Sequence, residues 1–206
     1  MKYFDAHCHV QFLQYDEDRD AVLARMREAE VGGLIVGTDR ETSRRAVDVA
    51  DGKTLFASVG LHPNDKPGDG YDDAYYEELA RDPKVVAIGE CGLDYYRPDE
   101  PEKEKARQKD VFARHIALAQ KLGKPLVIHA RPSKGTMDAY EDALDMLEAA
   151  GGVTGDFHFF VGDAKTAERI VALGSTVSYT AVLTSTDDDN DTARSLPPSS
   201  ILSETA

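Results

Sequence analysis

The chain has 206 residues, 41% of them hydrophobic, which is enough to bury the core of one domain, and we expect a single domain over residues 1–206. The net charge of −14 argues against a passive nucleic-acid binder, which would neutralise phosphates with Lys and Arg, although an enzyme carrying bound cations can still accept a phosphodiester. The sequence has neither an apolar run near the ~18 residues of a membrane span nor a signal peptide, so we expect a cytoplasmic protein.

Short apolar runs alternate along the chain with longer segments of helical periodicity. Several runs, such as Val85-Val86-Ala87-Ile88 and Leu126-Val127-Ile128, are nearly continuous in Val, Ile and Leu. Such continuity favours parallel strands that are covered on both faces. The predicted strands span residues 2–7, 33–38, 54–60, 84–89, 124–129, 153–158, 175–179 and 200–203.

Three segments between these runs predict amphipathic helices, because their apolar residues recur at spacings of three and four. The helices are expected over 17–30, 101–122 and 135–149, the second beginning at Pro101 and ending before Gly123. The stretch 184–199 contains four acidic residues and two prolines, and it is predicted to be a loop poor in helix.

Repeated strand–helix units predict a parallel α/β fold, and eight strand runs favour a TIM (β/α)8 barrel. A doubly wound open sheet is the rival, but its glycine-rich turn after the first strand is replaced here by His7-Cys8-His9. Complete barrels typically take ~250 residues, with a helix after each strand. Since this chain stops at or just after its eighth strand, we expect a barrel without its final helix, and therefore a less stable one.

Residues of metal-ligand type stand at the ends of several predicted strands, and such ends converge on one mouth of a barrel. His7 and His9 are two apart on an extended strand, so their side chains face the same way, and Asp5 on that face could orient an imidazole. A carboxylate among imidazoles can bridge two cations ~3.5–4 Å apart, an arrangement suited to hydrolysis. The candidate ligands are His7, His9, Glu90, His129 and His158.

Weaker candidates surround this set. His62 could contact a phosphate or a leaving group, or could simply tie down its turn. Arg131 shares a face with His129 and could either clamp an anion or form a salt bridge. Asp94 is expected to shape the mouth and contact substrate, with packing as the alternative, whereas His115 is interpreted as structural. The two cysteines are interpreted as small buried residues.

Five short motifs, in this order along the chain, resemble those of the TatD family of metal-dependent hydrolases, which are amidohydrolase-type TIM barrels. They are Asp5-Ala6-His7-Cys8-His9, Gly60-Leu61-His62-Pro63, Gly89-Glu90-Cys91-Gly92-Leu93-Asp94-Tyr95-Tyr96, Ile128-His129-Ala130-Arg131 and Phe157-His158-Phe159. The resemblance implies a two-metal centre holding Mg²⁺ or Mn²⁺, or alternatively Zn²⁺, with Glu90 as the bridge. It also implies a monomeric deoxyribonuclease that trims single-stranded DNA from the 3′ end, with no membrane or stable protein partner.

The family resemblance leaves two other functions open. Some members are assigned to ester or amide hydrolysis, including deacylation of D-aminoacyl-tRNA. The family's last motif is Glu-Thr-Asp, and this chain has Glu204-Thr205-Ala206 in its place. The missing Asp would be a metal ligand that positions the attacking water, and losing such a group can cost ~10²–10⁴-fold in rate. A catalytically crippled, metal-binding barrel is therefore the third hypothesis. Phe159, where members commonly have Cys, is a smaller departure.

Overall fold

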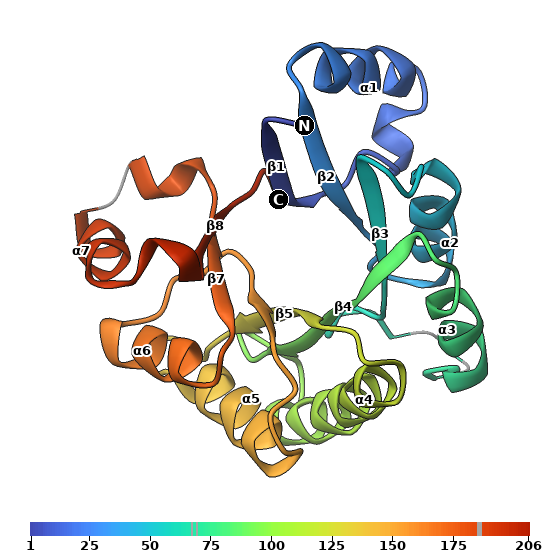
Figure 1. The fold of residues 1–206 in the computed structure, drawn as a ribbon. Coiled ribbons are helices and arrows are strands. Elements are labelled where there is room, and N and C mark those ends of the chain that lie inside the picture. The colour runs from blue at the N-terminus through green and yellow to red at the C-terminus, as the bar shows by residue number, and fades with distance from the viewer. Residues whose placement is uncertain (67, 69, 185–186) are drawn as a thin grey trace.

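The computed structural model describes residues 1–66, 68, 70–184 and 187–206. Its strands form one parallel eight-stranded sheet in sequential order, curled into a barrel with the helices outside, as Figure 1 shows. The TIM-barrel prediction is confirmed. The strands are β1 (Tyr3–Cys8), β2 (Val31–Val36), β3 (Leu55–Val59), β4 (Val85–Asp94), β5 (Leu126–Arg131), β6 (Gly155–Phe157), β7 (Thr176–Tyr179) and β8 (Ile201–Ser203).

The barrel is nearly closed where β8 meets β1. The backbone N–H of Thr205 donates to the His7 carbonyl at 3.3 Å, and the Thr205 hydroxyl donates to the Asp5 carboxylate at 2.6 Å. The first and last strands are thus joined by contacts just beyond the end of β8. Asp5 accepts from the backbone N–H groups of His7 and Thr205 as well, so it orients backbone here, and the prediction that it orients an imidazole is wrong.

The helices lie on the outer face of the sheet. Two of the predicted helices are shorter than expected, while the one over 101–122 matches at both ends, because Pro101 suits a first helical position and Gly123 adopts φ +63° after the last turn. The helices are α1 (Arg19–Glu28), α2 (Arg40–Val49), α3 (Asp73–Ala80), α4 (Pro101–Leu122), α5 (Asp138–Ala149), α6 (Ala164–Ala172) and α7 (Asp187–Ser195), with 3₁₀ turns η1 (Leu13–Tyr15), η2 (Ala181–Thr184) and η3 (Pro198–Ser200).

Helix α7 corrects the prediction of a loop over 184–199, of which residues 185–186 lie outside the described residues. Thr192 and Leu196, four residues apart, are both buried, and Leu196 packs into the core. The two prolines come after the helix has ended, where they do not interrupt its hydrogen bonds. Counting acids and prolines over the whole stretch concealed this short buried face.

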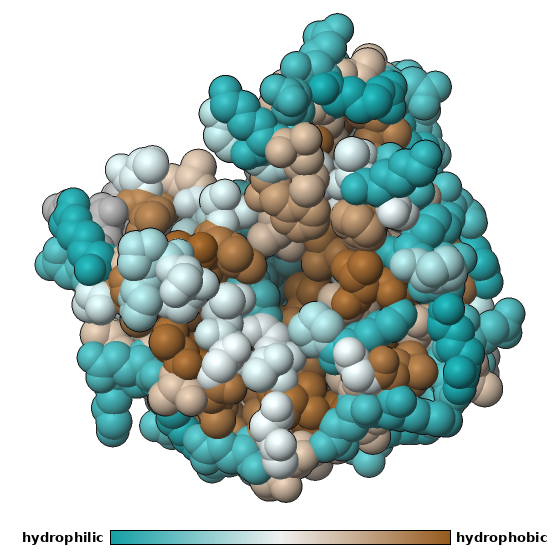
Figure 2. Space-filling model, in the orientation of Figure 1, coloured by the Kyte–Doolittle hydropathy of each residue, from teal (hydrophilic) through white to brown (hydrophobic). Residues whose placement is uncertain are grey.

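Side chains alternate between two buried layers, as the period of two in a strand requires. Leu34 and Val36 of β2 point into the barrel, where Ala87 and Val127 join them, while Ile35 belongs to the larger core between strands and helices. No helix in the described part of the chain is long and apolar enough to span a membrane. On the face drawn in Figure 2, hydrophobic side chains gather around a central hollow and hydrophilic ones cover the outer helices.

The cysteines are both buried and unpaired, in agreement with their interpretation as small buried residues. The thiol of Cys8 donates to the Leu34 carbonyl at 3.4 Å, on the opposite side of β1 from the neighbouring histidines. Burial raises the pKa of Cys8 to about 12 and that of Cys91 well above its ordinary value. Neither thiol is therefore a thiolate at neutral pH.

Candidate metal centre

The carboxylate of Glu90 lies at the centre of a group of imidazoles at one end of the barrel. Its Oε1 atom lies 2.9 Å from His158 Nε2, 3.1 Å from His129 Nδ1 and 3.3 Å from His62 Nε2. These side chains come from β4, from β5 and from the segments that follow β6 and β3. Strand ends that are distant in sequence are thus brought to one point, as the C-terminal mouth of a barrel does.

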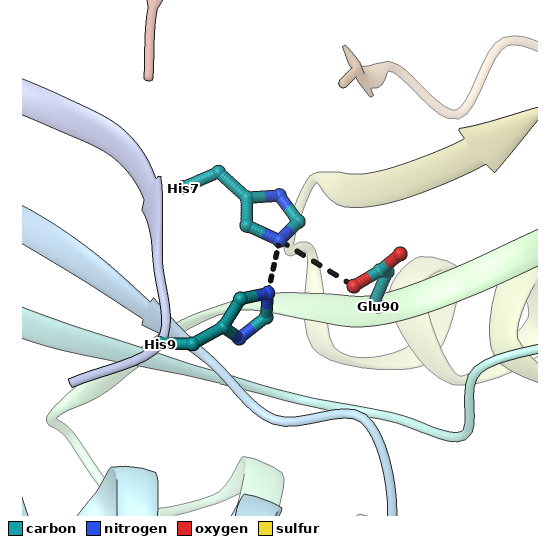
Figure 3. Close-up of side chains that lie close together, drawn as sticks. All are labelled: His7, His9 and Glu90. Atoms are coloured by element: carbon teal, nitrogen blue, oxygen red, sulfur yellow. Dashed lines mark hydrogen bonds and ion pairs between the residues drawn. The ribbon is translucent and has the colours of Figure 1, made fainter. Parts of the chain in front are cut away.

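The second oxygen of Glu90 faces the first strand. Its Oε2 atom lies 3.4 Å from His7 Nε2, which in turn lies 3.0 Å from His9 Nε2, as Figure 3 shows. His7 is fully buried and Glu90 is 3% exposed. A buried carboxylate is costly unless paired, so the surrounding nitrogens are what make its position tolerable.

The electrostatics of the cluster are those of a negative centre among bases. Burial alone would raise the pKa of Glu90, but the charge of His158 and the close His129 and His158 imidazoles hold it well below its usual range. Burial also lowers the pKa of His7 to about 4. It acts in the same direction on His158, where the negative charges of the nearby Glu90 and Glu204 carboxylates outweigh it and raise the pKa to about 10.

Two of the imidazoles donate a hydrogen bond from the ring nitrogen that faces away from the cluster. This bond determines which nitrogen is free to bind a cation. His9 donates from Nδ1 to the Val36 carbonyl at 2.9 Å, and His129 donates from Nε2 to Asp94 Oδ2 at 3.1 Å. A neutral ring with one N–H so engaged presents a lone pair on its other nitrogen. Those nitrogens, Nε2 of His9 and Nδ1 of His129, are the ones that point into the cluster. Metal-binding histidines are oriented in this way.

His62 is fixed in the opposite sense. Its Nδ1 accepts the backbone N–H of Asn64 at 3.1 Å, so the neutral ring carries its proton on Nε2. That N–H points at Glu90 and lies 3.3 Å from His129 Nδ1. The ring is therefore arranged as a hydrogen-bond donor to the cluster or to something bound there. The same contact with Asn64 ties down the turn, so both interpretations of His62 describe part of its environment.

A second buried carboxylate, Glu204, lies behind the imidazoles and was not among the predicted site residues. It accepts from the Phe159 backbone N–H and from the Ser178 hydroxyl, both at 2.7 Å. Its oxygens lie 3.8 Å from His158 Nδ1 and 4.0 Å from His7 Nδ1, and these two buried nitrogens have no hydrogen-bond partner among the described residues. Its position in the motif Glu204-Thr205-Ala206 was the available signal.

The donor set fits a divalent cation. Neutral imidazole nitrogens and carboxylate oxygens are ligands that such ions accept. Within each of three groups the ligand atoms lie within 4.8 Å of one another. Orphaned buried nitrogens on His7 and His158, aimed at a carboxylate too distant for a hydrogen bond, are what a site shaped around ions would leave. The groups are His7–His9–Glu90, His7–His158–Glu204 and His62–Glu90–His129.

Glycines allow the strands to approach closely enough for this convergence. Gly92 has φ +135°, and a Cβ added there would lie 2.1 Å from the carbonyl oxygen of His129. No other residue can occupy that position without moving β4 away from β5. The pair Gly92 and His129 is also in register across the two strands, so the same contact positions the imidazole.

A cavity of about 670 Å³ opens beside the cluster. Arg131 is exposed on its wall, with the guanidinium carbon 4.1 Å from the Tyr96 ring centroid, and Ala206 lies on the wall as well. Asp65 also lines it, and burial raises the pKa of this carboxyl group, which the sequence motifs did not mark. Other lining residues are His9, Phe12, Thr38, His62, Glu90, His129, Ala130, His158, Phe159 and Val161.

Two other predicted positions lie away from the cavity wall. Asp94 is 3% exposed and faces His129, Asn64 and the backbone N–H of Tyr96, so it supports an imidazole from behind. His115 is fully buried in α4, where it accepts the Leu61 backbone N–H at 3.0 Å, as its structural interpretation requires.

Comparisons with known proteins agree with one another. The sequence model of the family described as TatD related DNase matches residues 4–206. A Bacillus subtilis (strain 168) protein named "uncharacterized metal-dependent hydrolase YabD" is 34% identical over 209 residues, which cover 98% of this chain and 78% of that protein. The "3'-5' ssDNA/RNA exonuclease TatD" of Musicola paradisiaca (strain Ech703) is 33% identical over 184 residues, covering 86% of this chain and 66% of the relative.

A solved structure shows the same arrangement of strands and helices. The crystal structure of YjjV, described as a TatD homolog from Escherichia coli K12, superposes with a TM-score of 0.81 at 28% sequence identity. The match covers 98% of this chain and 78% of that one. The likeness therefore extends over the whole barrel rather than over the cluster alone.

Proposed function

Because the chain belongs to the TatD-related DNase family of metal-dependent hydrolases, we propose that it is a two-metal exonuclease that removes nucleotides from the 3′ ends of single-stranded DNA. The relative named as a 3'-5' ssDNA/RNA exonuclease supports the substrate and the polarity. The ions we favour are Mg²⁺ or Mn²⁺, with Zn²⁺ as an alternative that the imidazole-rich ligand set also suits.

The observation that carries the proposal is the convergence of imidazole nitrogens on both oxygens of one buried carboxylate. Glu90 Oε1 faces one pair of rings and Oε2 faces His7, and this arrangement supports the proposal that one carboxylate serves two ions. Two divalent cations in one site polarise a phosphoryl oxygen and supply an acidified water for in-line displacement. The proposed ligands are His7, His9, Glu90, His129 and His158.

The remaining residues would bind and orient the substrate. The Nε2–H of His62 points into the cluster and would donate to a phosphate or leaving-group oxygen. Arg131 on the cavity wall offers a planar fork that matches phosphate geometry. Asp94 holds the His129 ring from behind, so its part is positioning rather than substrate contact. We expect the enzyme to act as a monomer.

A metal-dependence assay tests the proposal directly. We expect the purified protein to shorten single-stranded DNA carrying a 5′ label into a ladder, to lose this activity in a chelator, and to regain it with Mn²⁺ or Mg²⁺. Glu90→Gln should abolish the ladder, while Glu104→Gln, which alters a buried α4 carboxylate paired with Lys66 and Arg107, serves as the matched control. Cleavage that persists in chelator, or in Glu90→Gln, would refute it.

Ester or amide hydrolysis, such as D-aminoacyl-tRNA deacylation, is the weaker hypothesis. Many amide hydrolases with this type of barrel use a modified lysine as the bridge, whereas the bridging position here is Glu90. The nearby Lys84 precedes β4, and its ammonium donates to the Val47 carbonyl. Assaying D-aminoacyl-tRNA beside DNA at equal enzyme concentration separates the two substrates.

The cavity wall at Ala206 suggests a gain-of-function experiment. The methyl side chain of Ala206, on the cavity wall, offers no ligand or proton acceptor. Ala206→Asp should raise the rate of nucleotide release by about 10²-fold, the usual scale for a positioned acid or base. Ala206→Asn, which is nearly the same size but uncharged, should gain far less. If the rate of Ala206→Asp equalled that of the wild type, the alanine at position 206 would not be what limits the activity.

A further inference from the structure

Phe159 combines two features that a phenylalanine serving only to fill a core does not show. The residue is 39% exposed, and its backbone adopts φ +47°. The left-handed region is unfavourable for a bulky residue, and such strain gathers at functional sites. The buried Glu204 holds the strained residue in place by accepting its backbone N–H at 2.7 Å.

The exposed ring belongs to an apolar part of the cavity wall. Phe159, Phe12 and Val161 all line the cavity that contains Glu90 and the imidazoles. The Phe12 ring stacks on His9, with centroids 4.4 Å apart and the planes inclined by 13°. One face of the Phe12 ring is therefore already covered by a side chain of the protein. Among these side chains Phe159 and Val161 are the exposed ones, and only Phe159 has an aromatic face.

Electrostatics give a nucleic acid little reason to bind here apart from the ions. The chain carries a net charge of −14, and Arg131 is the one Lys or Arg side chain among the described residues that line the cavity. Proteins that bind single strands usually combine a basic groove with aromatic side chains on which bases stack. Where a basic groove is missing, base stacking on aromatic side chains has to supply more of the affinity for a single strand.

We propose that Phe159 is the stacking platform for the base of the 3′-terminal nucleotide, an inference that rests on the proposed nuclease function. The terminal phosphodiester would reach the ligand cluster while its base lies on the exposed ring. A base has to leave its duplex to stack in this way, so the platform selects unpaired ends. Since every base has an aromatic face, the platform does not read sequence.

The experiment measures stacking without requiring catalysis. The full chain is titrated with Ca²⁺ and a single-stranded oligodeoxynucleotide carrying 2-aminopurine at its 3′ end, and with the same strand ending in an abasic residue as competitor. Stacking is expected to quench the fluorescence. The wild type should prefer the strand with a terminal base by about 5- to 150-fold.

Three variants separate an aromatic platform from simple packing. Phe159→Leu keeps an apolar side chain without a ring and should bring the preference near one, whereas Phe159→Tyr should retain it. Val161→Ala removes a neighbouring exposed apolar side chain and should leave the preference unchanged. Thermal unfolding of each variant verifies that it is folded.

The outcomes separate this inference from the proposed function. No preference in the wild type, no binding of the strand, an undiminished preference in Phe159→Leu, or an equal loss in Val161→Ala would each overturn the platform. A wild type that prefers the terminal base but releases no nucleotide with Mn²⁺ would leave the platform standing and refute the nuclease.

Discussion

Single residues behind the imidazoles decide which ring nitrogen faces the cluster. Asp94 is the clearest case, because its carboxylate accepts the Nε2–H of His129 and is itself held by the Asn64 amide at 2.8 Å. The backbone of Asp94 is held in turn by the Gln108 side chain, which bonds both its N–H and its carbonyl. The orientation of one imidazole thus depends on contacts that reach into α4.

Removing this support should weaken metal binding without unfolding the protein. We expect Asp94→Ala to lower the affinity for Mn²⁺ by about 10- to 100-fold, the usual effect of losing a group that orients a ligand. Asp94→Asn, which keeps an acceptor but loses the charge, should lie between. Free Mn²⁺ measured by electron paramagnetic resonance gives the affinity.

The matched control for that experiment is Asp142→Ala. Asp142 pairs with the Tyr95 hydroxyl and the Lys109 ammonium, so it is a carboxylate that contacts the residue after Asp94 but belongs to none of the three ligand groups. Equal Mn²⁺ affinities in Asp94→Ala and the wild type would show that the His129 orientation is set elsewhere.

At the scale of elements, the approach of β4 to β5 depends on Gly92. A side chain there would collide with the His129 backbone and would also have to adopt φ +135°. We expect Gly92→Ala to lower the free energy of unfolding by more than about 1 kcal/mol, because the native conformation is unavailable to alanine. Urea unfolding followed by circular dichroism measures the change.

Gly68→Ala provides the comparison, since a Cβ added at Gly68 meets no atom within 4 Å. The two substitutions differ in surroundings rather than in chemistry. If Gly92→Ala were as stable as Gly68→Ala and bound Mn²⁺ normally, the close approach of the strands would not be what positions His129.

The elements that could be predicted are those with an uninterrupted local pattern. Apolar runs located every strand, and α4 was correct at both ends because proline and glycine mark its limits. Strand β4 continues to Asp94 rather than stopping at residue 89, since its glycines extend the strand where an apolar pattern has ended. Helices α2, α3, α6 and α7 were not predicted, because short helices packed on a sheet bury few residues each.

The candidate site was partly readable for the same reason. The proposed ligands stand at or just past the ends of the predicted apolar runs and belong to residue types that bind metals, so position and chemistry coincided. Asp94 was predicted as a substrate contact and Glu204 was not predicted at all, because their contacts behind the imidazoles depend on the three-dimensional approach of β4, β5 and β8. The role of a residue that orients a metal ligand depends on tertiary contacts, which a local sequence pattern does not contain.

At the scale of the whole molecule, a buried histidine links stability to pH. His115 in α4 accepts a backbone N–H from Leu61, and burial lowers its pKa to about 4 from an ordinary value of 6.5. Below pH 6.5 the unfolded chain takes up a proton that the folded chain refuses. Stability from this group is therefore intact above pH 6.5 and is lost as the pH falls toward 4.

Between pH 7.5 and pH 5 the wild type should lose about 2 kcal/mol of unfolding free energy from His115 alone. His115→Gln keeps a polar acceptor but does not titrate, so its loss over the same interval should be smaller by that amount. Urea unfolding at the two pH values gives both numbers, and the difference between proteins cancels the other titrating groups. Parallel pH dependence in the two proteins would contradict the assignment.

The seam between β1 and β8 gives the centre a place in the order of folding. Asp5 and Thr205 are 200 positions apart in the sequence and are joined by hydrogen bonds. His7 lies two residues after Asp5, and Glu204 lies directly before Thr205, so this contact also brings His7 and Glu204 together. Contacts of such long sequence separation form late, because a large loop must close before they contribute stability. During synthesis, the helices and strands up to β7 can pack before these contacts form. The Glu204 carboxylate therefore comes to lie behind His7 and His158 only after β8 has joined β1, so the buried acid that accompanies the cluster is a late addition to it.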